Sequence, residues 1–282
     1  MYSVNNTGDM IRRIEANGTL ATGFGTAGEV DIRALTTDVA YGPVGVAFSP
    51  AFGGQLIVSA YNSGNLLRLD ATTGAWDTSF GVGGVLATSG GLPLGVAVTS
   101  SANFIYYTQT DNTVWRADGN GTNETLLSLL GDQPTSTWSL ALLNDTQLFV
   151  ADEKMGEVLK YNLSGTTATL DGTYGTSGRV TVGDGVYGIA VSPSGIAYVT
   201  SPNAGAVTVI SANGGTVQQF STGLGQPTGI ALYGGAVVPE VDPSAVPAVA
   251  GILSALAGIL ERWQRARRQG AVGVARSRSM SG

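Results

Sequence analysis

The sequence contains neither cysteine nor histidine. Without cysteine the chain forms no disulfide bonds and has no thiolate nucleophile. Without histidine it has no Ser-His-Asp triad, no histidine-ligated zinc and no histidine-ligated haem. It also lacks a phosphate-binding glycine loop and a G-x-S-x-G nucleophile turn. We therefore assign no catalytic residue and no cofactor-binding residue.

Charged residues are scarce, at 12% of the chain, where soluble domains average about 25%. Residues 1–239 contain 17 acidic and 8 basic residues, a net charge of −9, whereas residues 240–282 have a net charge of +3. A phosphate backbone repels an acidic protein, so the main part of the chain is not expected to bind nucleic acid.

The first ten residues, MYSVNNTGDM, contain neither the basic nor the apolar segment of a secretory signal peptide. They resemble a strand followed by a turn. If the protein is exported, its signal is expected upstream of Met1.

Glycine is abundant, with 42 residues, and short apolar runs alternate with turns rich in Gly, Asn, Ser and Thr. This composition is typical of short strands joined by tight turns, because glycine supplies positive φ angles. A Gly-Val/Ile-Ala motif recurs at 45–47, 95–97, 188–190 and 229–231, with a degenerate copy, Ser-Leu-Ala, at 139–141. Successive copies begin 50, 44, 49 and 41 residues apart.

Each unit continues with a second apolar run, a polar turn and a third alternating run. Residues 23–30, 79–86 and 173–180 share the pattern aromatic-Gly-x-x-Gly, which we interpret as a turn entering an outer strand. A four-stranded unit cannot bury both of its faces alone, but units stacked around an axis can. The sequence therefore predicts an all-β fold, a β-propeller over residues 1–237.

The two ends of this region are complementary. Residues 1–18 match the second and third strands of a unit, and residues 227–235 match a first strand. We expect both ends to complete the first blade together, which gives five four-stranded blades. If upstream sequence exists, six blades is the alternative.

The units resemble NHL repeats and related propellers through the pattern P-x-G-[VI]-A, a following strand of the form [LI]-[YFI]-V, a polar turn and a third strand. The resemblance covers residues 1–235 and implies the fold rather than a function.

Propellers often hold a ligand or metal at the mouth of the central channel. Three carboxylates precede inner strands, Asp38, Asp132 and Asp184, and converging oxygens of this kind suit Ca²⁺. The alternative is that they are turn residues that accept backbone hydrogen bonds. An exported propeller enzyme, a lyase or hydrolase with a divalent metal at the central channel, is therefore the rival hypothesis.

Two further groups of side chains are candidate sites. Asp152, Glu153 and Glu157 alternate with Lys154 and Lys160, which predicts a solvated rim of mixed charge. Trp76, Trp115 and Trp138 either stack on sugars or wedge between blades.

The chain ends differently from the repeats. Residues 245–260, from Ala245 to Leu260, contain no charge and predict a hydrophobic helix about 24 Å long. Arg262, Arg265, Arg267 and Arg268 follow and would hold its C-terminal side in the cytoplasm, with the propeller outside. The alternative is a peripheral helix packed on the propeller. Residues 238–282 thus form a second region.

The whole segment resembles a bacterial C-terminal sorting signal of the PEP-CTERM type, in its VPEID-like variant. The motif residues are Val238, Pro239, Glu240, Val241, Asp242 and Pro243, followed by the apolar stretch and the arginines. The resemblance implies transient membrane anchoring, cleavage by an exosortase-like protease and transfer to the cell envelope of an exopolysaccharide-producing bacterium.

The leading hypothesis is an exported, non-enzymatic propeller that binds a polysaccharide or a surface protein outside the cell. The alternatives are the metal-dependent enzyme and a receptor domain that stays tethered to the membrane.

Overall fold

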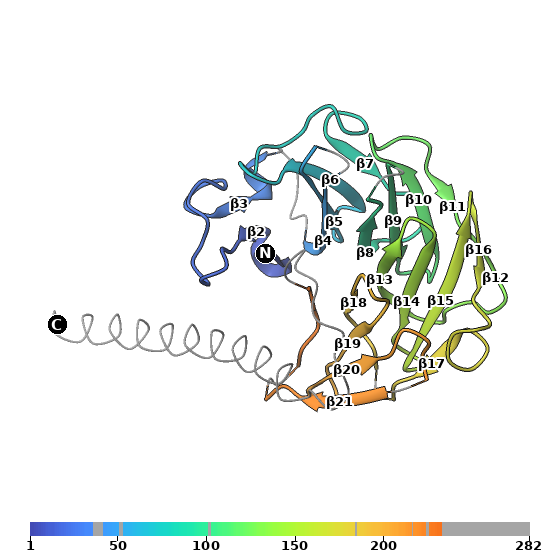
Figure 1. The fold of residues 1–282 in the computed structure, drawn as a ribbon. Helices are drawn as coiled ribbons and strands as arrows, with labels where there is room; N and C mark the ends of the chain where they lie inside the picture. The colour runs from blue at the N-terminus through green and yellow to red at the C-terminus, as the bar shows by residue number, and fades with distance from the viewer. Residues whose placement is uncertain are drawn as a thin grey trace, which may run out of the picture.

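The computed structural model describes residues 1–35, 42–50, 53–100, 103–183, 185–215, 217–223 and 226–232. The strands of these residues form five sheets that follow one another around a common axis, as the blades of a β-propeller (Figure 1). The helices of this part are two short 3₁₀ turns, η1 (Asn6–Gly8) and η2 (Ile32–Leu35). The predicted all-β propeller of five blades is confirmed.

The described strands of each blade come from one continuous stretch of the chain. Blade 1 contains β1 (Tyr2–Asn5), β2 (Met10–Arg13) and β3 (Glu29–Asp31). Blade 2 contains β4 (Pro43–Ser49), β5 (Gln55–Ala60), β6 (Asn65–Asp70) and β7 (Val85–Ala87). Blade 3 contains β8 (Pro93–Val98), β9 (Phe104–Gln109), β10 (Val114–Asp118) and β11 (Thr125–Leu126). Blade 4 contains β12 (Ser128–Leu130), β13 (Thr137–Asn144), β14 (Gln147–Asp152), β15 (Glu157–Ser164), β16 (Thr167–Leu170) and β17 (Arg179–Thr181). Blade 5 contains β18 (Ile189–Val191), β19 (Ala197–Ser201), β20 (Ala206–Ile210) and β21 (Val217–Ser221).

The copies at 45–47, 95–97, 139–141 and 188–190 lie on or directly before the inner strands, which surround the axis in Figure 1. The glycine is required there because neighbouring inner strands approach closely. A Cβ atom at Gly45 would stand 2.6 Å from the Leu94 carbonyl oxygen, and one at Gly95 would stand 2.7 Å from Ser139 Cα. The motif thus marks contact between the backbones of successive blades.

The aromatic-Gly-x-x-Gly segments are turns that lead into the outer strands β3, β7 and β17, as predicted. We call these segments, 23–30, 79–86 and 173–180, the interblade latches. In each latch the N–H of the glycine that follows the aromatic residue donates to a carbonyl of the next blade at 2.8 Å: Gly25 to Thr73, Gly81 to Asn120 and Gly175 to Asn213. These glycines have φ angles of 54°, 55° and 54°. The latches therefore fasten blade 1 to blade 2, blade 2 to blade 3, and blade 4 to blade 5.

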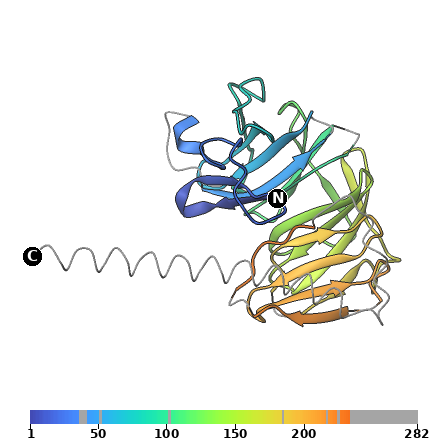
Figure 2. The same ribbon diagram turned by 60° about the vertical axis from the view of Figure 1, so that its left-hand side comes forward.

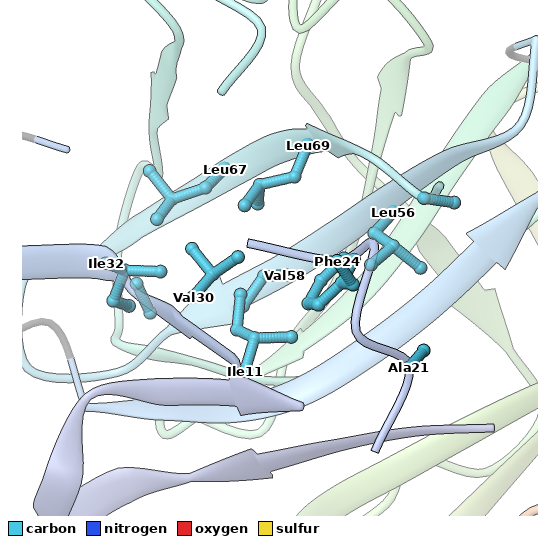
Figure 3. Close-up of a cluster of buried hydrophobic side chains, with 11 residues drawn as sticks. Ile11, Ala21, Phe24, Val30, Ile32, Leu56, Val58, Leu67 and Leu69 are labelled. Atoms are coloured by element: carbon cyan, nitrogen blue, oxygen red, sulfur yellow. The ribbon is translucent and has the colours of Figure 1, made fainter. Parts of the chain in front are cut away.

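Buried side chains gather between successive blades rather than within one. Between blades 1 and 2, Phe24 and Ile11 pack against Leu56, Leu67 and Leu69 (Figure 3). Comparable clusters join blades 2 and 3, blades 3 and 4, and blades 4 and 5. Figure 2 shows the sheets of blades 4 and 5 stacked face to face, in green to yellow and in orange. Each blade thus covers its neighbour's apolar face, as the repeat pattern predicted.

Blade 4 departs from the four strands expected of each unit. β12 follows the last strand of blade 3 but pairs in parallel with β16 of blade 4, Ser128 opposite Thr167. β17 pairs with β15 beyond the end of β16. By pairing in parallel, β12 covers the outer edge of β16. Without β12, the unpaired backbone groups of that edge would be open to pairing with other chains.

In blade 1 the described strands are the second, third and fourth of the repeat, since β2 precedes a latch as β6 does. Residues 226–232 contain no strand. Thr228 nevertheless lies beside Gly188, because a Cβ atom at Gly188 would stand 2.7 Å from the Thr228 carbonyl oxygen. Leu94 lies beside Gly45 in the same way. In the described part of the chain no backbone hydrogen bond joins 226–232 to β1. Completion of blade 1 by both ends stays a prediction.

The sorting motif, the apolar stretch 245–260 and the four arginines lie outside the described residues. No helix within the described ranges has the length and apolar character needed to span a bilayer. The C-terminal helix therefore stays a prediction.

Candidate functional site

The inner strands all begin at one face of the ring, which we call the entry face; they end at the opposite, exit face. Irregular pairing marks the start of three of them, between Pro43 and Gly45, between Pro93 and Val96, and between Thr137 and Ser139. Such bulges leave a residue outside the ladder and redirect its side chain. In blades 2, 3 and 4 the residues left out of the ladder include Val44, Leu94 and Trp138, of which Leu94 is buried and Trp138 exposed.

These entry-face positions carry different side chains. Blades 2 and 3 have Val44 and Leu94, whereas blades 4 and 5 have Trp138 and Tyr187. The Trp138 and Tyr187 rings are in contact, with centroids 4.8 Å apart and planes inclined by 35°. Trp138 is 40% exposed. The junction of blades 4 and 5 therefore presents an aromatic pair to solvent.

The other two tryptophans of the propeller are partly buried, and the indole N–H of each makes a hydrogen bond within its own blade. Trp76 lies under the second latch, where its Nε1 donates to the Gly84 carbonyl at 3.1 Å. Trp115 packs against the core between blades 2 and 3, and its Nε1 donates to Thr113 Oγ1 at 2.8 Å. Of the three tryptophans considered as sugar-stacking residues, two are structural, and Trp138 remains available to a ligand.

Polar groups lie beside the aromatic pair. Ser136 Oγ donates to Glu153 Oε2 at 3.1 Å, and the Glu153 N–H donates to the Ser136 carbonyl at 2.8 Å. Partial burial raises the pKa of Tyr187, and the negative charge of the nearby Glu153 carboxylate raises it further.

The predicted solvated rim is correct for Lys154, which is exposed, and wrong for Asp152 and Lys160, whereas Glu153 and Glu157 are half-buried. Asp152 is 2% exposed and accepts hydrogen bonds from the Thr135 N–H at 2.6 Å and the Met155 N–H at 3.2 Å. Lys160 is buried and pairs with Asp171 at 3.1 Å. Strand pairing turns both residues inward, which the alternation of charges along the sequence did not reveal.

The proposed metal ligands are placed only in part. Asp132 forms an ion pair with Arg179, whose Nη1 also lies 3.6 Å from Glu157 Oε2. Asp38 and Asp184 lie outside the described residues. Within the described ranges, no three His, Cys, Asp or Glu side chains gather in a way that suits a metal ion. A Ca²⁺ site stays a prediction.

Sequence reasoning named Trp138, and named Glu153 only as part of a solvated rim, but missed the partner Tyr187 and the neighbouring Ser136. A signal was present: each aromatic directly precedes the first residue of a motif copy, Ser139 or Gly188. Alignment of the repeats on that residue places the two aromatics at equivalent positions of adjacent blades.

Comparison with known proteins shows the fold alone. No protein-family model and no curated protein matches the chain. The chain is similar to two crystal structures of virginiamycin B lyase from Staphylococcus aureus. A catalytically inactive histidine-to-alanine variant with quinupristin has a TM-score of 0.53 at 12% identity, with 80% of this chain and 70% of that chain covered. The selenomethionine-substituted enzyme has a TM-score of 0.55 at 12% identity, with 81% and 72% covered. Both are consistent with the propeller; the NHL resemblance stays a prediction.

Proposed function

We propose that the chain is an exported, non-enzymatic interaction module of the cell surface or extracellular matrix. Its propeller binds a partner through the entry face at the junction of blades 4 and 5. The C-terminal region, 238–282, serves as a sorting segment that holds the protein at the membrane during export.

The exposed Trp138–Tyr187 pair is the observation that carries this proposal. An indole that is 40% exposed leaves apolar surface in water, whereas Trp76 and Trp115 are partly buried and hydrogen-bonded within their own blades. Aromatic side chains near the centre of an interface contribute much of its binding energy. The hydrogen-bonded Glu153 and Ser136 supply fixed polar groups beside the rings. Apolar surface with a few oriented polar groups is typical of a binding site.

Binding is favoured over catalysis by the chemistry of the chain. The inactive lyase variant lacks a single histidine of that enzyme, and the present sequence contains no histidine at all. Its acidic propeller also disfavours nucleic acid as a partner.

The binding proposal is tested with the purified full chain and the envelope fraction of cells that produce it. Trp138→Ala is expected to reduce retention on that fraction at least tenfold. Phe48→Ala is the matched control, because Phe48 is also an exposed aromatic, 50% exposed and stacked on Tyr2, but lies near the end of its inner strand, at the exit face. Equal retention of wild type and Trp138→Ala would overturn the proposal, and turnover of the bound material would replace the module by an enzyme.

The sorting proposal rests on the order of three features, the motif at 238–243, the uncharged stretch 245–260 and the arginines that follow. Mass spectrometry of the protein from fractionated cells tests it. A C-terminus near Pro239 in the envelope or medium is the expected result. An intact Gly282 in the cytosol would contradict export, and an intact tail in the membrane would favour the tethered receptor.

A further inference from the structure

The entry-face pair forms a platform with one open side rather than an enclosed cage. Trp138 and Tyr187 are in contact with each other at 4.8 Å, so no ligand lies between them. The exposed surface of Trp138 is what remains for a ligand. A platform with one open side can stack on a flat, apolar face of a ligand, whether the stacked unit is terminal or internal in a polymer.

Hydrogen-bonding groups border the platform. The Glu153 carboxylate accepts a hydrogen bond from Ser136 Oγ, which leaves part of its acceptor capacity for other donors. The exposed Asn203 side chain lies near Gly185. A Cβ atom at Gly185 would stand 3.4 Å from Asn203 Nδ2 and 3.6 Å from Tyr187 Cε2, so the glycine keeps that point free of a side chain. Glu153 accepts hydroxyl hydrogens, and the Asn203 amide can both donate and accept.

This combination matches a pyranose ring, which has an apolar face of C–H bonds and a rim of hydroxyl groups. The C–H face lies on the indole, and the hydroxyls donate to the carboxylate in charge-assisted hydrogen bonds. A cationic ligand fits less well, because its recognition uses several rings around the charge, and Lys154 follows Glu153 directly in the sequence. Acidic saccharides are disfavoured by the net charge of −9 over residues 1–239.

We propose that the entry face at the junction of blades 4 and 5 binds neutral polysaccharide chains with equatorial hydroxyl groups, with one pyranose ring stacked on Trp138 and hydroxyls donating to Glu153. This inference rests on the proposed function and assigns its ligand class. Cellohexaose is the probe, since all its hydroxyls are equatorial and both faces of each ring are apolar.

Isothermal titration calorimetry of the full chain with cellohexaose tests the inference. Wild type is expected to bind, and Trp138→Ala to weaken binding at least tenfold. Trp138→Phe should retain part of the affinity, because a smaller ring still stacks. Glu153→Gln should weaken binding by a smaller factor, since the amide oxygen still accepts a hydrogen bond. Phe48→Ala should bind as wild type, and far-ultraviolet circular dichroism should be unchanged in every variant.

The outcomes separate this inference from the proposed function. Absence of cellohexaose binding to wild type, or binding that Trp138→Ala leaves unchanged, overturns the inference. Tetramethylammonium binding that is lost in Trp138→Ala, without cellohexaose binding, also overturns it and assigns a cation site. If Trp138→Ala loses retention on the envelope fraction but cellohexaose does not bind, the ligand class fails and the proposed function stands. If Trp138→Ala loses cellohexaose binding but is still retained on the envelope fraction, the saccharide site stands and the proposed function fails.

Discussion

The junction between blades 1 and 2 and the junction between blades 4 and 5 use the same latch but bury different groups. In the first, Phe24 packs among hydrocarbon side chains, including Leu67, which pairs with Val58. In the second, the latch aromatic is Tyr174, and the position of Leu67 is taken by Thr208, which pairs with Val199. In the described part of the chain the hydroxyls of Tyr174, Thr208 and Ser201 have no hydrogen-bond partner.

The difference shows where the ring departs from good packing. Buried polar groups without partners destabilise a fold, and three of the six such atoms among the described residues lie at the junction whose entry face carries Trp138 and Tyr187; the other three belong to Gln55, Gln109 and Arg116 of blades 2 and 3. Natural proteins commonly violate packing rules at functional sites. The hydrocarbon junction stabilises the ring, whereas the other junction carries the candidate site.

The largest expected effect comes from truncating the buried aromatic side chains of the first and third latches, Phe24 and Tyr174. Phe24→Ala should lower the free energy of unfolding by about 3–5 kcal/mol, because it leaves a cavity among buried leucines. Tyr174→Ala should cost about 1 kcal/mol less, since the variant also loses a buried hydroxyl that has no partner. Urea unfolding followed by circular dichroism measures both. Equal losses would show that the two junctions do not differ in this way.

The second largest loss of stability is expected from substitution of the latch glycines Gly25 and Gly175. A Cβ atom at Gly25 would stand 2.1 Å from the Glu29 carbonyl oxygen, at a φ angle of 54°. Gly25→Ala should therefore cost more than about 2 kcal/mol. Gly175→Ala should behave alike, because its Cβ would stand 2.2 Å from the Arg179 carbonyl oxygen.

Gly165 is the matched control for these two glycines. It has a φ angle of 61° but nothing near its Cβ position. Gly165→Ala should therefore cost only about 1 kcal/mol, the penalty of a left-handed backbone conformation. If all three alanine variants lost the same stability, the close approach inside the latch would be irrelevant.

Alkaline pH should distinguish the junctions further. Burial raises the pKa of Tyr174 far above the ordinary value, whereas Phe24 has no ionisable group. Because the folded-state pKa is raised, the stabilisation is complete below the unfolded pKa of about 10 and is lost as the pH rises above it. Between pH 9 and pH 11, wild type should lose about 1.4 kcal/mol more than Tyr174→Phe. Parallel stability curves for the two proteins would contradict a buried, neutral Tyr174.

The smallest expected effect is a gain. Thr208→Val removes a buried, unpartnered hydroxyl at nearly constant volume and should stabilise the protein by about 1 kcal/mol. Thr200→Val is the control, because Thr200 Oγ1 accepts the Gly188 N–H at 2.8 Å. That variant should be destabilised in the same thermal unfolding experiment. A destabilised Thr208→Val would mean that its hydroxyl has a partner in solution.

Much of this fold was predictable because each repeat contains glycines at the positions where the backbone must turn or approach another strand closely. The glycine before Val46 is needed where inner strands meet, and Gly25 is needed where the latch turns. The path of β12 was not predictable, since three residues, Ser128 to Leu130, do not show which blade they join. That choice depends on β16, nearly forty residues later in the chain.

The candidate site was predictable only in part. Trp76, Trp115 and Trp138 look alike in the sequence, and only their packing separates the structural residues from the exposed one. Asp132 stands before an inner strand, as a channel ligand would, but Arg179 of β17 pairs with it. Contacts between residues this far apart in sequence are set by tertiary packing, which local patterns do not encode.

The parallel strand β12 has a consequence for how such a ring can change in length. It belongs to the third sequence repeat but completes the fourth sheet, so repeat boundary and sheet boundary do not coincide there. Excision of that repeat alone would uncover β16, and its duplication would leave a second copy of β12 without a partner edge. Gain or loss of a unit is therefore tolerated more easily elsewhere in the ring than at this position.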